Sequence, residues 1–125
     1  MSPPVSRLRR ALSRLAASPQ ELEAEELQED TAQCGATPVA QLEDRRRAVV
    51  RGTVRTVTLR PRAGVPALEA ELYDGSGTLS IVWLGRRQIR GIDPGRGMKA
   101  EGMVTTTGAG PVMFNPRYEL LPAGR

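Results

Sequence analysis

The sequence predicts a mainly β domain, a small closed barrel of five strands preceded by a polar helical arm. The spacing of apolar residues changes from a helical to a strand-like period near residue 47. Five apolar or alternating segments follow, separated by turns rich in glycine and proline. A sheet this small leaves its edges unpaired unless it closes on itself, which favours a barrel.

Residues 1–44 form the predicted helical, acidic segment. Its first residues, MSPPVSRLRRALSRLAAS, contain serine and arginine but no acid, a composition typical of a transit peptide or of a basic amphipathic helix. We favour the helix, with apolar residues near one face at Val5, Leu8, Leu12 and Leu15.

A second helix is predicted to begin after Ser18. The order Ser18-Pro19-Gln20-Glu21 has the form of a capping box, with proline at the first helical position. The following ELEAEELQED contains strong helix formers but few large apolar residues, so we expect this helix to be exposed or lightly packed. Gly35 and Pro38 then mark the passage into the barrel.

Residues 45–125 form the predicted barrel, and its first strand is long. In AVVRGTVRTVTL, Val50, Gly52 and Val54 share one face, but Val57 and Leu59 lie on the opposite phase. Such a change of phase predicts a bend or bulge that lets one strand serve two sheets.

The other strands follow in order. ALEAELYD and TLSIVWLG flank the turn Asp74-Gly75-Ser76-Gly77, which predicts a hairpin. A phosphate-binding loop normally opens a helix, whereas a strand follows here, so we interpret the turn as structural. RRQIRGIDPGRG is expected to hold a short helical turn, and MKAEGMVTTT and PVMFNPRYELL are the fourth and fifth strands.

The order of these motifs resembles an OB-fold nucleic-acid-binding domain over about residues 45–122. The resemblance rests on Gly52-Thr53-Val54, the stretch 72–77, Val82-Trp83-Leu84, Gly97, Gly102 and the stretch 113–119. It is similar to the anticodon-binding OB group, especially to the wedge domain of RecG-type helicases. The whole chain also resembles small actinobacterial proteins with a helical arm and one OB-fold. Unlike the helicases, the sequence contains no Walker-type phosphate loop.

Charge is distributed unevenly along the chain. Residues 1–44 contain 4 arginines and 8 acidic residues, whereas residues 45–125 contain 14 basic and 6 acidic residues. A basic barrel suggests a polyanionic partner, while the alternative is a solvated, arginine-rich surface. The Arg45-Arg46-Arg47 run beside Glu43 and Asp44 is interpreted as solvated.

Candidate binding residues are arginines and aromatic residues, because arginine grips phosphate and stacks on bases. Trp83 shares the phase of Leu79 and Ile81, which favours a core position over a stacking platform. Tyr73 shares its face with Glu69 and Glu71, so that part of the surface is acidic. The predicted nucleic-acid-binding residues are Arg51, Arg55, Arg60, Arg62, Tyr73, Trp83, Arg86, Arg87, Arg117 and Tyr118, with Arg90 beside the loop arginines.

Catalysis is not expected. The chain has no histidine and a single cysteine, Cys34, and carboxylates such as Asp74 and Asp93 have no partner at a suggestive spacing. No cofactor or metal is predicted, and no apolar run is long enough to cross a membrane, so we expect a cytoplasmic protein. The predicted partner is DNA or RNA. A protein-interaction module, or self-association through the N-terminal helices, is the alternative.

Overall fold

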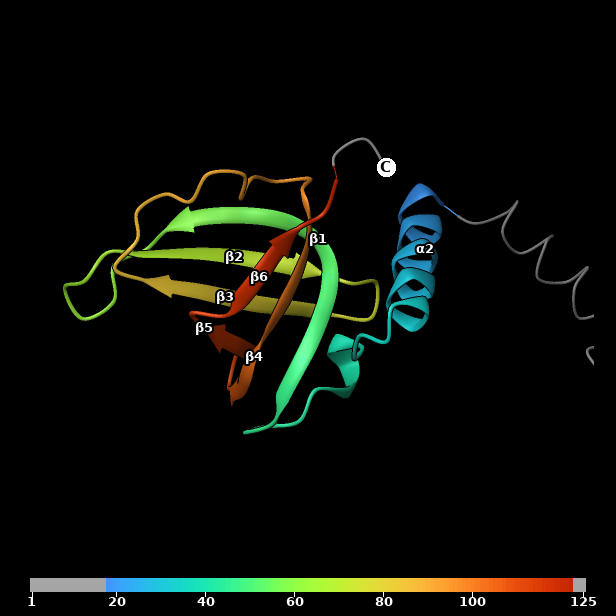
Figure 1. Cartoon of the computed structure of the whole chain (residues 1–125), viewed down its shortest axis with the longest axis horizontal. Helices are drawn as coiled ribbons and strands as arrows, with labels where there is room; N and C mark the ends of the chain where they lie inside the picture. The colour runs from blue at the N-terminus through green and yellow to red at the C-terminus, as the bar shows by residue number, and fades with distance from the viewer. Residues whose placement is uncertain (1–17, 123–125) are drawn as a thin grey trace, which may run out of the picture.

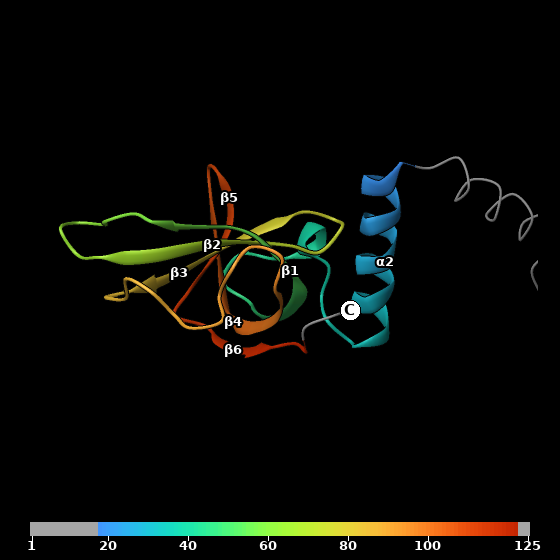
Figure 2. The ribbon, with the colours of Figure 1, turned by 90° about the horizontal axis from the view of Figure 1, so that it is seen from above.

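The computed structural model describes residues 18–122, a helix standing beside a β-barrel (Figures 1 and 2). The basic helix predicted before residue 18 lies outside the described residues. The elements are α2 (Pro19–Gln33), a short 3-10 helix η1 (Val39–Gln41), β1 (Arg47–Leu59), β2 (Ala67–Tyr73), β3 (Thr78–Leu84), β4 (Gly97–Thr107), β5 (Gly110–Phe114) and β6 (Arg117–Leu120).

Five strands close a ring in the order β1, β2, β3, β5 and β4, with β4 pairing back to β1. Only the β3–β5 pair is parallel. The ring encloses aliphatic side chains that are fully buried, including Val54, Leu72, Leu79, Ile81 and Met113. The predicted mainly β fold with an OB-fold barrel and an N-terminal helix is therefore confirmed.

Strand β1 closes the ring by bending. Its first half, to Thr53, pairs with β4, and its second half, from Thr53, pairs with β2. The register with β2 shifts between Val54 and Thr56, so Arg55 is an extra residue on β1. A Cβ at Gly52 would overlap the Tyr73 carbonyl oxygen, so only glycine permits the two strands to approach this closely. The predicted bend and the double use of this strand are confirmed.

Two details of the predicted strands were wrong. The fifth strand is broken by Asn115 and Pro116 into β5 and β6, both of which pair with β4. Asn115 has a left-handed backbone, with φ 47°, and the chain there advances one residue more than β4 does. The second detail is the stretch 86–97, which could hold a short helical turn but forms no helix. It contains two tight turns, closed by the Ile92 amide on the Ile89 carbonyl at 3.2 Å and by the Arg96 amide on the Asp93 carbonyl at 3.1 Å, and it buries Ile89 and Ile92 in the core.

Helix α2 begins as the capping box predicts and packs lightly, as expected. The Ser18 hydroxyl accepts from the Glu21 amide at 3.2 Å, and the Glu21 carboxylate accepts from the Ser18 amide at 3.4 Å. Thr31 is its only buried residue. The helix stands at one end of the barrel, opposite the loop between β1 and β2 (Figure 2).

The turn between β2 and β3 is the predicted hairpin, and Asp74 organises it. This side chain is 1% exposed. Its Oδ1 accepts from the Ser76 amide at 2.9 Å, the Ser76 hydroxyl at 2.7 Å and the Gly77 amide at 3.1 Å. Its Oδ2 accepts from the Val39 amide of η1 at 2.8 Å. Asp74 therefore ties the segment before the barrel to the barrel itself.

Asp74→Ala should reduce the free energy of unfolding by about 2–3 kcal/mol, because it leaves three buried or half-buried amides without their charged acceptor. Urea unfolding followed by tryptophan fluorescence measures this change. Asp93→Ala is the matched control, because Asp93 is exposed, and it should cost less than about 0.5 kcal/mol. Equal effects of the two substitutions would contradict the role given to Asp74.

Candidate nucleic-acid interface

Six of the predicted binding arginines lie at two ends of the barrel rather than on one surface. Arg60, Arg62, Arg86 and Arg87 lie at the end formed by the β1–β2 loop and by the chain that leaves β3. Arg51 and Arg55 lie at the other end, beside α2. We call these the loop end and the helix end.

Backbone contacts hold the loop end together. The Arg60 amide donates to the Ala67 carbonyl at 2.9 Å, and the Gly85 amide donates to the Pro66 carbonyl at 2.7 Å. The last residues of β1 and β3 are therefore beside the start of β2, which brings Arg60 near Arg86 and Arg87. Among the described residues, these three exposed guanidinium groups have no ion pair or hydrogen bond. Their charges face solvent and are available to an anion.

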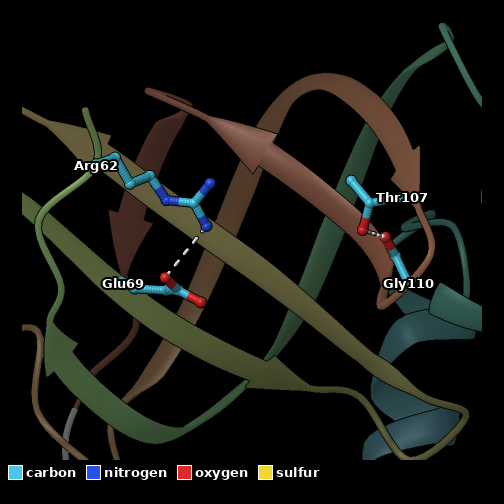
Figure 3. Close-up of polar contacts among 4 residues, drawn as sticks. All are labelled: Arg62, Glu69, Thr107 and Gly110. Atoms are coloured by element: carbon cyan, nitrogen blue, oxygen red, sulfur yellow. Dashed lines mark hydrogen bonds and ion pairs between the residues drawn. The ribbon is translucent and has the colours of Figure 1, made fainter.

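Arg62 differs from its neighbours because it folds back over the barrel. Its Nη2 lies 3.3 Å from Glu69 Oε2, and its Cζ lies 5.6 Å from the centre of the Phe114 ring. Figure 3 shows Arg62 reaching from the β1–β2 loop toward Glu69 on β2. It also shows the β4–β5 turn, where the Thr107 hydroxyl donates to the Gly110 carbonyl at 2.9 Å. The Phe114 side chain is 39% exposed. The loop end thus combines free arginines with one accessible aromatic ring.

The outer face of β2 is acidic, as the alternation of Glu69, Glu71 and Tyr73 predicts, but both glutamates have partners. Glu69 pairs with Arg62, and Glu71 accepts from the Thr56 hydroxyl at 2.6 Å. The Tyr73 ring lies under the guanidinium of Arg55, with 4.5 Å between Cζ and the ring centre. This face is therefore closer to neutral than its sequence indicates.

Trp83 lies in the core, as its phase predicts. It is 5% exposed, and the Tyr118 ring packs edge-on against it with 5.6 Å between the ring centres. The indole Nε1 is buried without a hydrogen-bond partner in the part of the chain that the structure describes. Tyr118, which is 40% exposed, therefore presents the accessible ring of this pair, and Arg117 precedes it on β6.

Asn115 holds this corner of the barrel. Its amide donates to the Val82 carbonyl at 2.8 Å, and its Oδ1 accepts from the Leu84 amide at 2.9 Å. The end of β3 is thereby fixed beside β5 and β6. Asn115, in the N-P-R-Y-E stretch, therefore helps to hold the barrel closed at this corner.

At the helix end, Arg51 and Arg55 line a groove of about 560 Å³ between α2 and the barrel. Arg51 Nη1 contacts Cys34 Sγ at 2.9 Å, and Arg55 Nη2 lies 3.2 Å from Glu23 Oε1. Unlike the arginines of the loop end, these two already have partners on or just after α2.

Two contributors to these surfaces were not assigned from the sequence. Phe114 follows Met113, a residue of the barrel core, so alternation along the strand places it on the opposite face, a signal that could have identified it. Arg96 lines the groove at the helix end while its Nε donates to the Leu121 carbonyl at 3.0 Å. It lies in an irregular loop, where no periodicity indicates the direction of a side chain.

Within residues 18–122 no group of histidine, cysteine or acidic residues is arranged to hold a metal, and no helix is long and apolar enough to span a membrane.

Comparison with solved structures identifies similar barrels. An OBody bound to hen egg-white lysozyme matches with a TM-score of 0.56 and 16% identity, over 70% of this chain and 92% of the OBody. RecG bound to a three-way DNA junction matches with a TM-score of 0.53 and 18% identity, over 69% of this chain but only 12% of RecG. No protein-family model matches the sequence, and no curated protein is detectably similar to it. At these identities the likeness shows the fold.

Tyr118→Ala should expose the indole of Trp83, because the tyrosine ring packs against it. Since Trp83 is the only tryptophan, its emission should move to longer wavelength and acrylamide should quench it more strongly. Tyr118→Phe, which keeps the ring, is the control and should leave both readings unchanged. An unchanged spectrum in Tyr118→Ala would show that other groups bury the indole.

Proposed function

We propose that this protein is a non-catalytic nucleic-acid-binding module that holds single-stranded or branched DNA, or RNA, with little regard to sequence. The observation that carries the proposal is the loop end, where Arg60, Arg86 and Arg87 are exposed and have no partner among the described residues, and where Arg62 lies 5.6 Å from the exposed ring of Phe114. The proposal includes a cytoplasmic location.

The chemistry of the loop end suits an unpaired strand. Guanidinium groups bind phosphate oxygens through parallel hydrogen bonds, and they also stack on bases. Exposed aromatic rings offer a surface to any base, because every base has a π face. With few rings and many arginines, most of the binding free energy should come from phosphate contacts, so binding should weaken steeply with salt.

The similarity to RecG supports a branched substrate. That protein was solved bound to a three-way DNA junction, and the motif order of this chain resembles the wedge domain of the same helicase group. The present sequence lacks the phosphate loop of a motor, so in this proposal the barrel holds a strand or fork without moving it.

Replacing Arg86 and Arg87 together by alanine should weaken binding to single-stranded DNA and lower the salt slope. Each lost phosphate contact reduces the slope of log K against log salt by about 0.7, so we expect a decrease of about 1.4. Fluorescence anisotropy with an oligothymidylate at several salt concentrations measures both quantities.

The matched control replaces Arg45 and Arg46, which are exposed and lie beside Asp44 and Glu43. This pair removes the same formal charge, but its salt slope should stay within about 0.3 of the unsubstituted protein. Equal losses in both double variants would indicate a diffuse charge effect. Failure of the unsubstituted protein to bind single-stranded DNA, forked DNA or RNA at low salt would reject the proposal.

A protein-interaction module is the second candidate, and the OBody complex favours it because a barrel of the same fold binds a protein there. Leu59, Val65 and Leu84 are exposed apolar residues near the loop end and would suit such a contact. Purified protein with a low absorbance ratio at 260 and 280 nm, together with a stoichiometric protein partner, would favour this candidate over nucleic acid.

A further inference from the structure

The acidic helix α2 lies against the arginine side of β1. Glu23, Glu26 and Asp30 line one wall of the groove at the helix end, and Arg51, Arg55 and Arg96 line the other. The ion pair between Glu23 and Arg55 joins these walls. One basic side chain of the barrel, Arg55, is therefore paired with a carboxylate of the preceding segment, and two more basic side chains line the same groove.

Polar contacts hold the helix in this position. Besides the Glu23–Arg55 pair, Gln28 Nε2 donates to the Gly75 carbonyl at 2.7 Å, and the Thr31 hydroxyl donates to the Arg51 carbonyl at 3.4 Å. The two side chains of the ion pair are 40% and 44% exposed. Exposed pairs of this kind are weak and are screened by salt. The buried residue of α2 is Thr31, and none of its large apolar residues is fully buried or belongs to the barrel core, so displacement of the helix would expose little apolar surface.

We propose that α2 is an intramolecular competitor for nucleic acid, with its carboxylates occupying the positions that phosphates take when a strand extends from the loop end onto β1. This inference rests on the proposed function. A bound strand replaces Glu23 at Arg55 and displaces the helix. The arginine side of β1 is then a second part of the binding surface, open only when α2 has moved away.

The contacts of the Arg55 side chain favour an exchange of Glu23 for a phosphate. Arg55 is the bulged residue of β1, and Tyr73 supports its guanidinium from below while Glu23 contacts it from the helix. Loss of Glu23 removes one of these two partners and leaves the other. The guanidinium would therefore remain over the Tyr73 ring, with its freed N–H groups available to a phosphate.

Glu23→Lys tests the competition because it replaces an attraction to Arg55 by a repulsion. We expect its affinity for an oligothymidylate at low salt to exceed that of the unsubstituted protein by about three- to tenfold. Glu23→Gln, which only removes the attraction, should give a smaller increase. The gain should vanish at high salt, where the helix is already released by screening.

The matched control is Glu43→Lys, which adds the same charge at an exposed glutamate paired with Arg46 rather than with the groove. Its affinity should change by less than about twofold. Circular dichroism and thermal unfolding should show an intact barrel in each variant, because Glu23 and Glu43 both lie outside the core.

Hydrogen–deuterium exchange gives a reading that does not depend on affinity. An isolated helix of this length is marginal, so a displaced α2 should exchange its amides faster. We expect faster exchange in residues 19–33 when oligothymidylate is added to the unsubstituted protein, and in free Glu23→Lys without any ligand. Protection of α2 by the ligand would overturn the inference.

The two proposals fail in different ways. If oligothymidylate binds and the Arg86 and Arg87 variant weakens it, while Glu23→Lys and Glu43→Lys behave alike, then the competition is rejected and the proposed function stands. If none of the variants binds nucleic acid at low salt, both proposals are rejected.

Discussion

The bend in β1 is the constraint on which the rest of the structure depends. A ring of five strands closes here only because one strand pairs with β4 through its first half and with β2 through its second. Gly52 allows the close approach to Tyr73, and the extra residue at Arg55 changes the phase of the strand. The same bend aims Arg55 outward between Tyr73 and α2. Closure of the barrel and the position of a candidate binding residue therefore have one cause.

Two polar side chains complete the closure where backbone pairing stops. Asp74 connects the β2–β3 turn to η1, and Asn115 connects the end of β3 to the break between β5 and β6. Each satisfies amides that would otherwise lose water without gaining a partner, which is costly in a barrel this small. The Asp74 carboxylate accepts the hydrogen bonds of the amides in the turn 74–77, so these amides are not available to a phosphate. The proposed function therefore assigns anion binding to side chains at the two ends of the barrel.

Much of the fold follows from the sequence, because alternation, turn residues and the capping box at Ser18 are local signals. The succession of strand segments along the chain, the bend or bulge in the first strand and the core phase of Trp83 were predicted from them. The break at Asn115 was not, because apolar residues continue on both sides of it. The candidate site was less predictable, since the partners of Arg51 and Arg55 come from a helix distant in sequence. Periodicity shows which face a residue occupies, but not what will cover that face.

Folding brings part of the acidic segment of the chain against part of the basic barrel. In the sequence, an acidic segment precedes a basic barrel, and their charges only partly cancel in the net value. In the structure, Glu23 meets Arg55 at the helix end, while Arg60, Arg86 and Arg87 at the loop end have no partner among the described residues. In the proposed function, a polyanion would meet the open positive surface of the loop end first and the covered surface of the helix end second. In that order, a strand bound at the loop end would bring further phosphates within reach of α2. The helix would then oppose the later contacts with β1 without blocking the first contacts at the loop end.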